Sequence, residues 1–164
     1  RRYSGAINRP RKDIPMATFL SRRRLLILAP VVLLLAGGAG VAARMMQPPP
    51  ADLDLALSKP TEGAHYIATL AADVSPVPVG AMHTWTVTVT TPDGKPAEGV
   101  KIDIDGGMPQ HGHGLPTAPR VTADLGNGAH RIEGMKFSMP GWWTLTVAID
   151  GPAGPDAATF NLVL

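Results

Sequence analysis

Two histidines two positions apart, His111 and His113, are spaced so that they could bind one metal ion together. They lie in residues 106–117 (GGMPQHGHGLPT), a segment rich in glycine and proline that we expect to be a loop joining two strands. Residues two apart in an extended stretch point to the same side, so both imidazoles could face one ion. Met108 and Met139 would add thioethers, and thioether with imidazole favours copper over zinc. The candidate cofactor is therefore copper.

The same segment has a simpler interpretation. Glycine and proline can be present only to shape the loop, and a loop histidine often bonds only to backbone. Three further histidines occur, and of these only His83 lies at the end of a core-facing row from which it could reach the loop. His65 and His130 are not expected to be ligands. Metal binding and a purely structural loop both stay open on the sequence alone.

Trp142 is the second informative residue. Its neighbour Trp143 shares a strand face with Leu145 and Val147, so Trp142 is expected to point outward. Exposed tryptophan is typical of interfaces, because the ring is apolar and its N–H is polar. We expect Trp142 to bind a partner or the membrane surface, and the alternative is that a loop covers it.

The elements that must position these residues are strands. Alternation of apolar and polar residues is clearest over 82–90, where His83, Trp85, Val87 and Val89 share one face. Turn signals follow at 92–95 (PDGK) and 126–128 (GNG). About seven short strands in ~100 residues indicate an all-β, immunoglobulin-like β-sandwich. The segments with this pattern are 65–72, 82–90, 100–105, 120–125, 129–136, 142–149 and 160–164.

The core of this sandwich must be held by packing alone, because the chain has no cysteine. The absence of cysteine also removes thiolate metal sites and thiol catalysis. The expected core residues are Trp85, Ile102, Ile132, Phe137, Trp143, Val147 and Phe160.

Charge divides the chain into two unlike parts. Residues 1–24 carry eight Arg and Lys against one acid, whereas residues 44–164 carry seven basic and twelve acidic residues. The basic character of the whole chain comes from its first residues, so no nucleic-acid partner is expected for the main domain.

Between these parts lies an uncharged run of 19 residues, 25–43 (LLILAPVVLLLAGGAGVAA). A helix of ~20 apolar residues spans a bilayer, so we predict a single transmembrane helix with the lipid bilayer as a partner. Arg22, Arg23 and Arg24 precede it, which predicts a cytoplasmic N-terminus and an exported C-terminal domain. The alternative is a cleaved export signal, because small residues end the run and the arginines resemble a twin-arginine signal. We also expect the three arginines to contact a partner.

Four regions are expected along the chain. The triple proline 48–50 favours a stiff, extended spacer between the anchor and the domain. The regions are a basic cytoplasmic tail (1–24), the transmembrane anchor (25–43), a Pro-rich linker (44–60) and a periplasmic β-sandwich (61–164).

Sequence signals of catalysis are absent. There is no Gly-x-Ser-x-Gly turn, no phosphate-binding loop and no HExxH motif. The carboxylates are scattered over turns and outward strand positions, where they serve solubility. We expect the protein not to be an enzyme.

Two motifs carry a resemblance to a known family. Residues 108–117 (MPQHGHGLPT), followed by 134–142 (GMKFSMPGW), resemble those of FixH-like and YtkA-like bacterial domains. The resemblance covers roughly residues 61–164. It implies a small extracytoplasmic β-sandwich behind one transmembrane helix, with a link to copper handling and terminal-oxidase assembly. It places His111, His113, Met108 and Met139 at the motif-bearing positions.

Two functions follow as expectations. The first is a non-enzymatic accessory subunit of a bacterial inner-membrane complex, respiratory or photosynthetic, with other membrane-protein subunits as partners. The second is a periplasmic copper-binding assembly factor or chaperone that uses the HGHG loop. The anchor supports the first, and the two histidines support the second.

Overall fold

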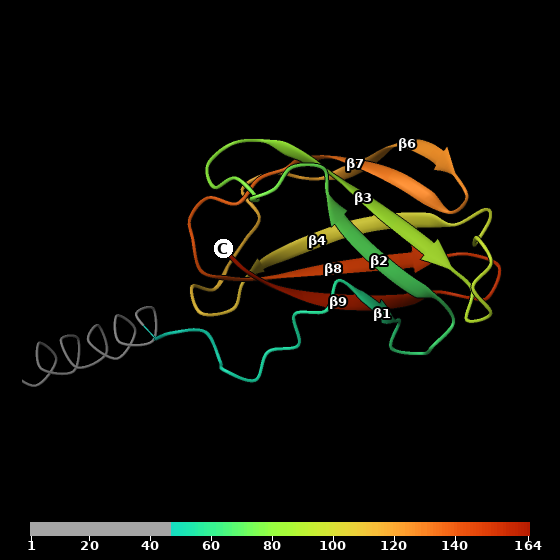
Figure 1. Cartoon of the computed structure of the whole chain (residues 1–164), viewed down its shortest axis with the longest axis horizontal. Coiled ribbons are helices and arrows are strands. Elements are labelled where there is room, and N and C mark those ends of the chain that lie inside the picture. The colour runs from blue at the N-terminus through green and yellow to red at the C-terminus, as the bar shows by residue number, and fades with distance from the viewer. Residues whose placement is uncertain (1–46) are drawn as a thin grey trace, which may run out of the picture. The chain divides into compact units, whose positions relative to one another are not determined.

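The alternating segments form strands, as their side-chain pattern requires. The computed structural model describes residues 47–164, and in that part all regular structure is β (Figure 1). Strand β3, for example, buries every second residue because His83, Trp85, Val87 and Val89 face the interior. The strands are β1 (Ser58–Pro60), β2 (Ile67–Ala72), β3 (His83–Thr90), β4 (Lys101–Met108), β5 (His113–Gly114), β6 (Arg120–Gly126), β7 (Ala129–Met135), β8 (Trp142–Asp150) and β9 (Asp156–Val163).

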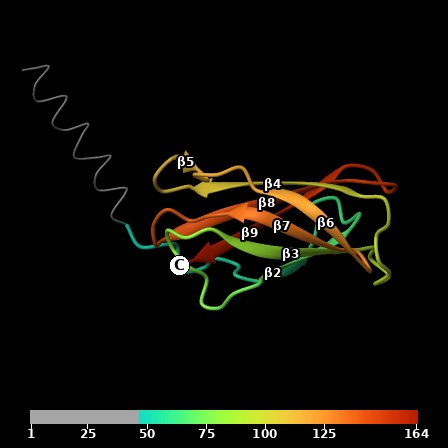
Figure 2. The same ribbon diagram turned by 90° about the horizontal axis from the view of Figure 1, so that it is seen from above.

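These strands make two antiparallel sheets that pack face to face. The first sheet has the order β1-β2-β3-β7-β6 and the second β5-β4-β8-β9. Figure 2 shows β4 and β2 on opposite sides of the sandwich. The expectation of an all-β sandwich is therefore confirmed.

The core lies between the sheets and contains most of the side chains expected there. Trp85, Ile132, Phe137, Trp143, Val147 and Phe160 are each at most 1% exposed. Ile102 is only partly buried and packs against the edge of the core.

Two short strands differ from what the sequence predicts. β1 occupies the last three residues of the expected linker, where Ser58 and Pro60 align with Thr69 and Ile67 of β2. The glycine- and proline-rich segment is a hairpin, not an open loop, because β5 folds back onto the end of β4.

Glycine allows this hairpin to close. A Cβ on Gly106 would lie 2.4 Å from the carbonyl oxygen of Thr144, and one on Gly107 would lie 2.6 Å from that of His113. Neither position has room for a side chain, so β4 continues through both glycines with strands on each side of it.

The chain turns and loops of one end of the sandwich come together, and we call this the hairpin end. The 73–82 loop bridges the 136–141 loop through Val79 and Phe137, and Gly141 exchanges two backbone hydrogen bonds with Leu164. Gln110 of the hairpin bonds to the backbone of Gln47. The hairpin end thus consists of residues 47–50, 73–82, 108–119, 136–141 and 163–164.

The expected tail and anchor, residues 1–24 and 25–43, lie outside the described residues. Within residues 47–164, no helix has the length and apolar character needed to cross a membrane.

Candidate functional site

The β4–β5 hairpin presents the two histidines. Met108 aligns with His113, and the carbonyl oxygen of Met108 accepts hydrogen bonds from the backbone N–H groups of His111 (3.1 Å) and Gly112 (2.8 Å). Gly112 takes a positive φ of 70°, which suits glycine at this tight turn. The ring centroids of His111 and His113 are 5.9 Å apart. The imidazoles are therefore neighbours, although they lie across a tight turn and not along the extended stretch that the sequence predicts.

The buried indole of Trp143 lies beneath His113, and we call it the floor of the hairpin. Its indole is fully buried, lies edge-on to the His113 ring at 5.6 Å, and donates a hydrogen bond from Nε1 to the carbonyl oxygen of Met139 (3.1 Å). One side chain thus contacts both the hairpin and the 136–141 loop. Met139 itself is 37% exposed.

Met108 takes a different position from that expected of a ligand. It is 2% exposed and belongs to the core. A Cβ on Gly141 would lie 2.8 Å from the Met108 Cε, so this methyl group packs directly against the glycine backbone. Met108 is the last residue of β4, and its side chain faces the core. It therefore packs beneath the hairpin and is not accessible from the surface.

His83 lies deeper and apart from the pair. Its ring contacts Phe137 at 5.5 Å, Phe137 contacts Trp143 at 5.2 Å, and Trp143 contacts His113. Two aromatic rings thus separate His83 from the hairpin along this chain of contacts. His83 is 8% exposed; its Nδ1 bonds to the carbonyl oxygen of Ala81, and its Nε2 has no partner among the described residues.

The remaining histidines lie elsewhere. His130 is buried within β7, and its Nε2 likewise has no partner in the described part of the chain. His65 Nδ1 is 3.8 Å from Asp156 Oδ2, in the turn between β1 and β2. Neither belongs to the hairpin end.

Trp142 alternates with the buried Trp143 along β8, and it is half-buried rather than fully exposed. A pocket forms around it from Gln47, Pro48, Pro50, Pro109 and Gln110. Gln110 Nε2 donates to the carbonyl oxygens of Gln47 (3.0 Å) and Pro48 (3.1 Å), which holds the proline segment beside the ring. Trp142 Nε1 donates to Asn161 Oδ1 (3.0 Å). Residues of the expected linker thus line this pocket together with Trp142.

The sequence of this domain matches the family model described as YtkA-like over residues 64–148, more than half of the chain. The chain belongs to the YtkA-like family. This confirms the YtkA-like part of the resemblance; the FixH-like part stays a prediction.

Other comparisons add little to this membership. The chain is similar to a solved DUF4426 family protein from Pseudomonas aeruginosa PAO1, with a TM-score of 0.46 and 16% identity, covering 61% of this chain and 90% of that chain. No curated protein matches the chain.

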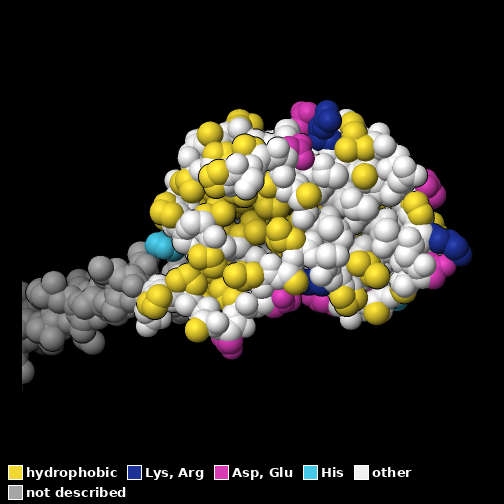
Figure 3. Space-filling view, in the orientation of Figure 1, with side chains coloured by type: hydrophobic (Ala, Val, Ile, Leu, Met, Phe, Trp, Pro, Cys, Tyr) yellow, Lys and Arg dark blue, Asp and Glu magenta, His cyan; other side chains and the backbone are white. Residues whose placement is uncertain are grey.

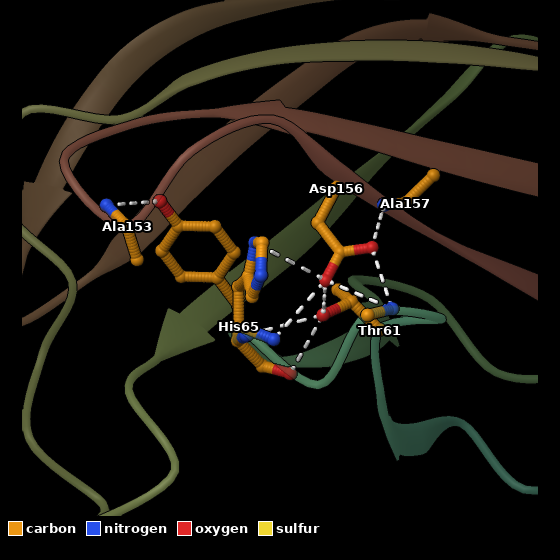
Figure 4. Close-up of polar contacts among 7 residues, drawn as sticks. Thr61, His65, Ala153, Asp156 and Ala157 are labelled. Atoms are coloured by element: carbon orange, nitrogen blue, oxygen red, sulfur yellow. Dashed lines mark hydrogen bonds and ion pairs between the residues drawn. The ribbon is translucent and has the colours of Figure 1, made fainter.

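The YtkA-like domain also has a polar site that its sequence pattern does not reveal. At the end opposite the hairpin, Asp156 fastens the 61–66 turn to the start of β9 (Figure 4). Its carboxylate accepts hydrogen bonds from Thr61 Oγ1 (2.6 Å) and from the backbone N–H groups of Gly63, His65 and Ala157. The carboxylate is 6% exposed.

These donors set the charge state of Asp156. The hydrogen bond from Thr61, and then those from the backbone of Gly63, His65 and Ala157, lower the pKa of the carboxyl well below its ordinary value, against the opposing effect of desolvation. Asp156 is therefore ionised and fully bonded. A carboxylate in this state is a structural fastener and has no free lone pair directed at a substrate.

The donors available for a metal in the YtkA-like domain are limited. Among residues 47–164 there is no group of three or more His, Cys, Asp or Glu side chains that could hold an ion. His113 Nδ1 bonds to the carbonyl oxygen of Gly114 (3.0 Å). Of the four expected ligands, His111, His113 and Met139 are partly or largely exposed, whereas Met108 is buried. Arg22, Arg23 and Arg24, the other expected partner-binding residues, lie outside the described residues.

Proposed function

We propose that this protein is a non-enzymatic accessory subunit of a bacterial inner-membrane complex, respiratory or photosynthetic. Residues 25–43 anchor it, its N-terminus is cytoplasmic, and its immunoglobulin-like sandwich is displayed in the periplasm. The observation that carries the proposal is the bonding of Gln110 to Gln47 and Pro48. It fixes the start of the domain at the end that carries the histidines and Trp142.

This arrangement gives the hairpin end a direction. Gln47, the first described residue, is bonded to the hairpin end. The chain therefore passes from the proposed anchor directly to this end of the sandwich. The half-buried Trp142 and the exposed Met139 are then near the membrane subunits that the protein would contact. Tryptophan and methionine are both enriched at protein interfaces.

Extraction of the native protein in a mild detergent tests this proposal. We expect a particle larger than the monomer that contains further subunits in fixed proportion to this chain. Trp142→Ala is expected to weaken that association, whereas Lys95→Ala at the opposite end should leave it intact. A monomer without further subunits, under conditions that keep other membrane complexes whole, would contradict the proposal.

A second candidate is copper binding, which the shared floor of Trp143 supports. This indole contacts the His113 ring and donates a hydrogen bond to the backbone carbonyl oxygen of Met139, so the residue that carries the thioether is fixed through its backbone to the same indole, and His111 lies beside His113. Imidazole serves Cu(I) and Cu(II), while the soft thioether selects Cu(I). The protein would then deliver or store copper for a membrane oxidase.

Titration with Cu(I) and Cu(II) tests this second candidate. We expect a Kd of about a micromolar or tighter, lost in His111→Ala/His113→Ala because both imidazoles are removed. Met139→Leu should weaken Cu(I) binding and leave Cu(II) binding unchanged, and His65→Ala is the matched control. Equal affinity in the double variant and in His65→Ala would rule out the hairpin as the site.

A further inference from the structure

The hairpin end differs from the rest of the domain in its charge. Of the residues that make up the hairpin end (47–50, 73–82, 108–119, 136–141 and 163–164), only Asp73 and Lys136, each at the margin of a loop, are charged. The opposite end carries charges in its loops, including Glu62, Asp93, Lys95 and Glu98. In Figure 3 the left end of the described part shows hydrophobic and histidine side chains, while charged side chains gather at the right end and along the margins.

Exposed apolar side chains gather at the same end. Seven large hydrophobic residues of the described chain are exposed, and five of them lie at the hairpin end. A soluble domain rarely gathers exposed apolar groups in one place unless they meet another surface. The five are Val74 (43% exposed), Val79 (42%), Met82 (64%), Met139 (37%) and Val163 (50%).

The short connection to residues 25–43 indicates which surface the exposed apolar side chains meet. Residue 47 lies at the hairpin end, and only residues 44–46 separate it from the apolar run 25–43. Three residues span at most about 10 Å. If 25–43 crosses the bilayer, as in the proposed function on which this inference rests, the hairpin end cannot move far from the lipid headgroups.

We propose that the hairpin end lies against the outer surface of the lipid bilayer. Val74, Val79 and Met82, which are the most exposed apolar side chains of the 73–82 loop, enter the headgroup region. Lys136, partly buried at the margin, is the one basic residue of the hairpin end, so the attraction is apolar and does not require anionic lipid.

The absence of cysteine makes the test direct, since each introduced cysteine is the only one in the chain. Met82→Cys and Val74→Cys report on the hairpin end, and Lys95→Cys, whose native side chain is 79% exposed, reports on the opposite end. Each full-length variant carries a polarity-sensitive dye and is reconstituted into phosphatidylcholine liposomes. Lipids with a spin label near the headgroup then quench any dye that touches the bilayer.

We expect the dyes at positions 82 and 74 to shift to shorter wavelength and lose most of their emission, while the dye at 95 keeps its emission. The quenching should not change between low and high salt, because no charge pairing is involved. Equal, weak quenching at all three positions, in chains that float with the liposomes, would overturn the inference. The proposed membrane-anchored subunit would then still stand, and a protein partner would be the alternative occupant of the hairpin end. Chains that fail to float with the liposomes would overturn the anchor as well.

Discussion

Trp143→Ala is expected to reduce the free energy of unfolding by about 3–5 kcal/mol, the range for a large buried aromatic. The indole is fully buried, packs against Phe137 at 5.2 Å and donates to the carbonyl oxygen of Met139. Its loss leaves a cavity between the sheets and a carbonyl without its donor. Since small domains are stable by only about 5–15 kcal/mol, this change should bring the domain close to unfolding. Urea denaturation followed by circular dichroism measures it.

The neighbouring tryptophan provides the matched control. Trp142→Ala removes a half-buried ring with one hydrogen bond to Asn161, so its cost should be about 1 kcal/mol. Trp143→Phe separates packing from positioning, because it keeps an aromatic ring and removes the N–H that holds Met139. In that variant we expect a changed NMR signal of His113 with most of the stability retained. Similar losses for Trp142→Ala and Trp143→Ala would refute the role of Trp143 as the floor.

Asp156→Asn is expected to cause the second large loss, seen as a fall in the thermal midpoint of about 5 °C or more at pH 7. Asparagine cannot accept the hydrogen bonds of Thr61, Gly63, His65 and Ala157 together, because its NH₂ group turns a donor toward other donors. The 61–66 turn would then separate from β9. Thermal unfolding of both proteins measures the difference.

The pH dependence follows from the lowered pKa of Asp156. A carboxyl whose folded pKa lies below its unfolded value of ~3.9 stabilises the fold fully above that pH and loses this contribution as the pH falls toward the folded pKa. The native chain should therefore lose stability between about pH 5 and pH 2, and Asp156→Asn should show a shallower decline over that window.

Asp93→Asn serves as the control for both measurements. Hydrogen bonds from Lys95 and Thr91 lower the pKa of Asp93 to about 2, but this carboxylate lies on an exposed turn. Solvent screens such pairs, so the midpoint should change little. If Asp93→Asn costs as much as Asp156→Asn, the burial of the Asp156 carboxylate is not what makes it important.

Strand identity was predictable from the sequence because each strand has one buried face. The alternation at 82–90 and 142–149 corresponds to β3 and β8 within one residue at each end, and the inward faces contain the expected side chains. The short strands were not predictable in this way. β1 has only three residues, and β5 has two, which is too few to show a period.

The contacts of the candidate site were predictable only within one segment. His111 and His113 are adjacent, but across the tight turn at Gly112 and not along the extended stretch from which the sequence predicted it. The hydrogen bonds between Asp156 and the 61–66 turn join residues more than 90 positions apart, and Gln110 bonds to Gln47. Such pairings depend on how the two sheets fold over each other, and no local pattern encodes them.

The two-residue length of β5 has a consequence for the assembled protein. β5 pairs only with Gly107 and Met108, and Leu115 N–H bonds to the carbonyl oxygen of Gly106, so residues 101–105 of β4 form an edge of this sheet with no further strand beside them in the described part of the chain. Lys101, Asp103 and Asp105 are the exposed residues of this edge segment, and they alternate with partly buried ones. Charges at such positions oppose strand-to-strand aggregation. Copies of the domain can therefore be present at high concentration without their β4 edges joining into continuous sheets.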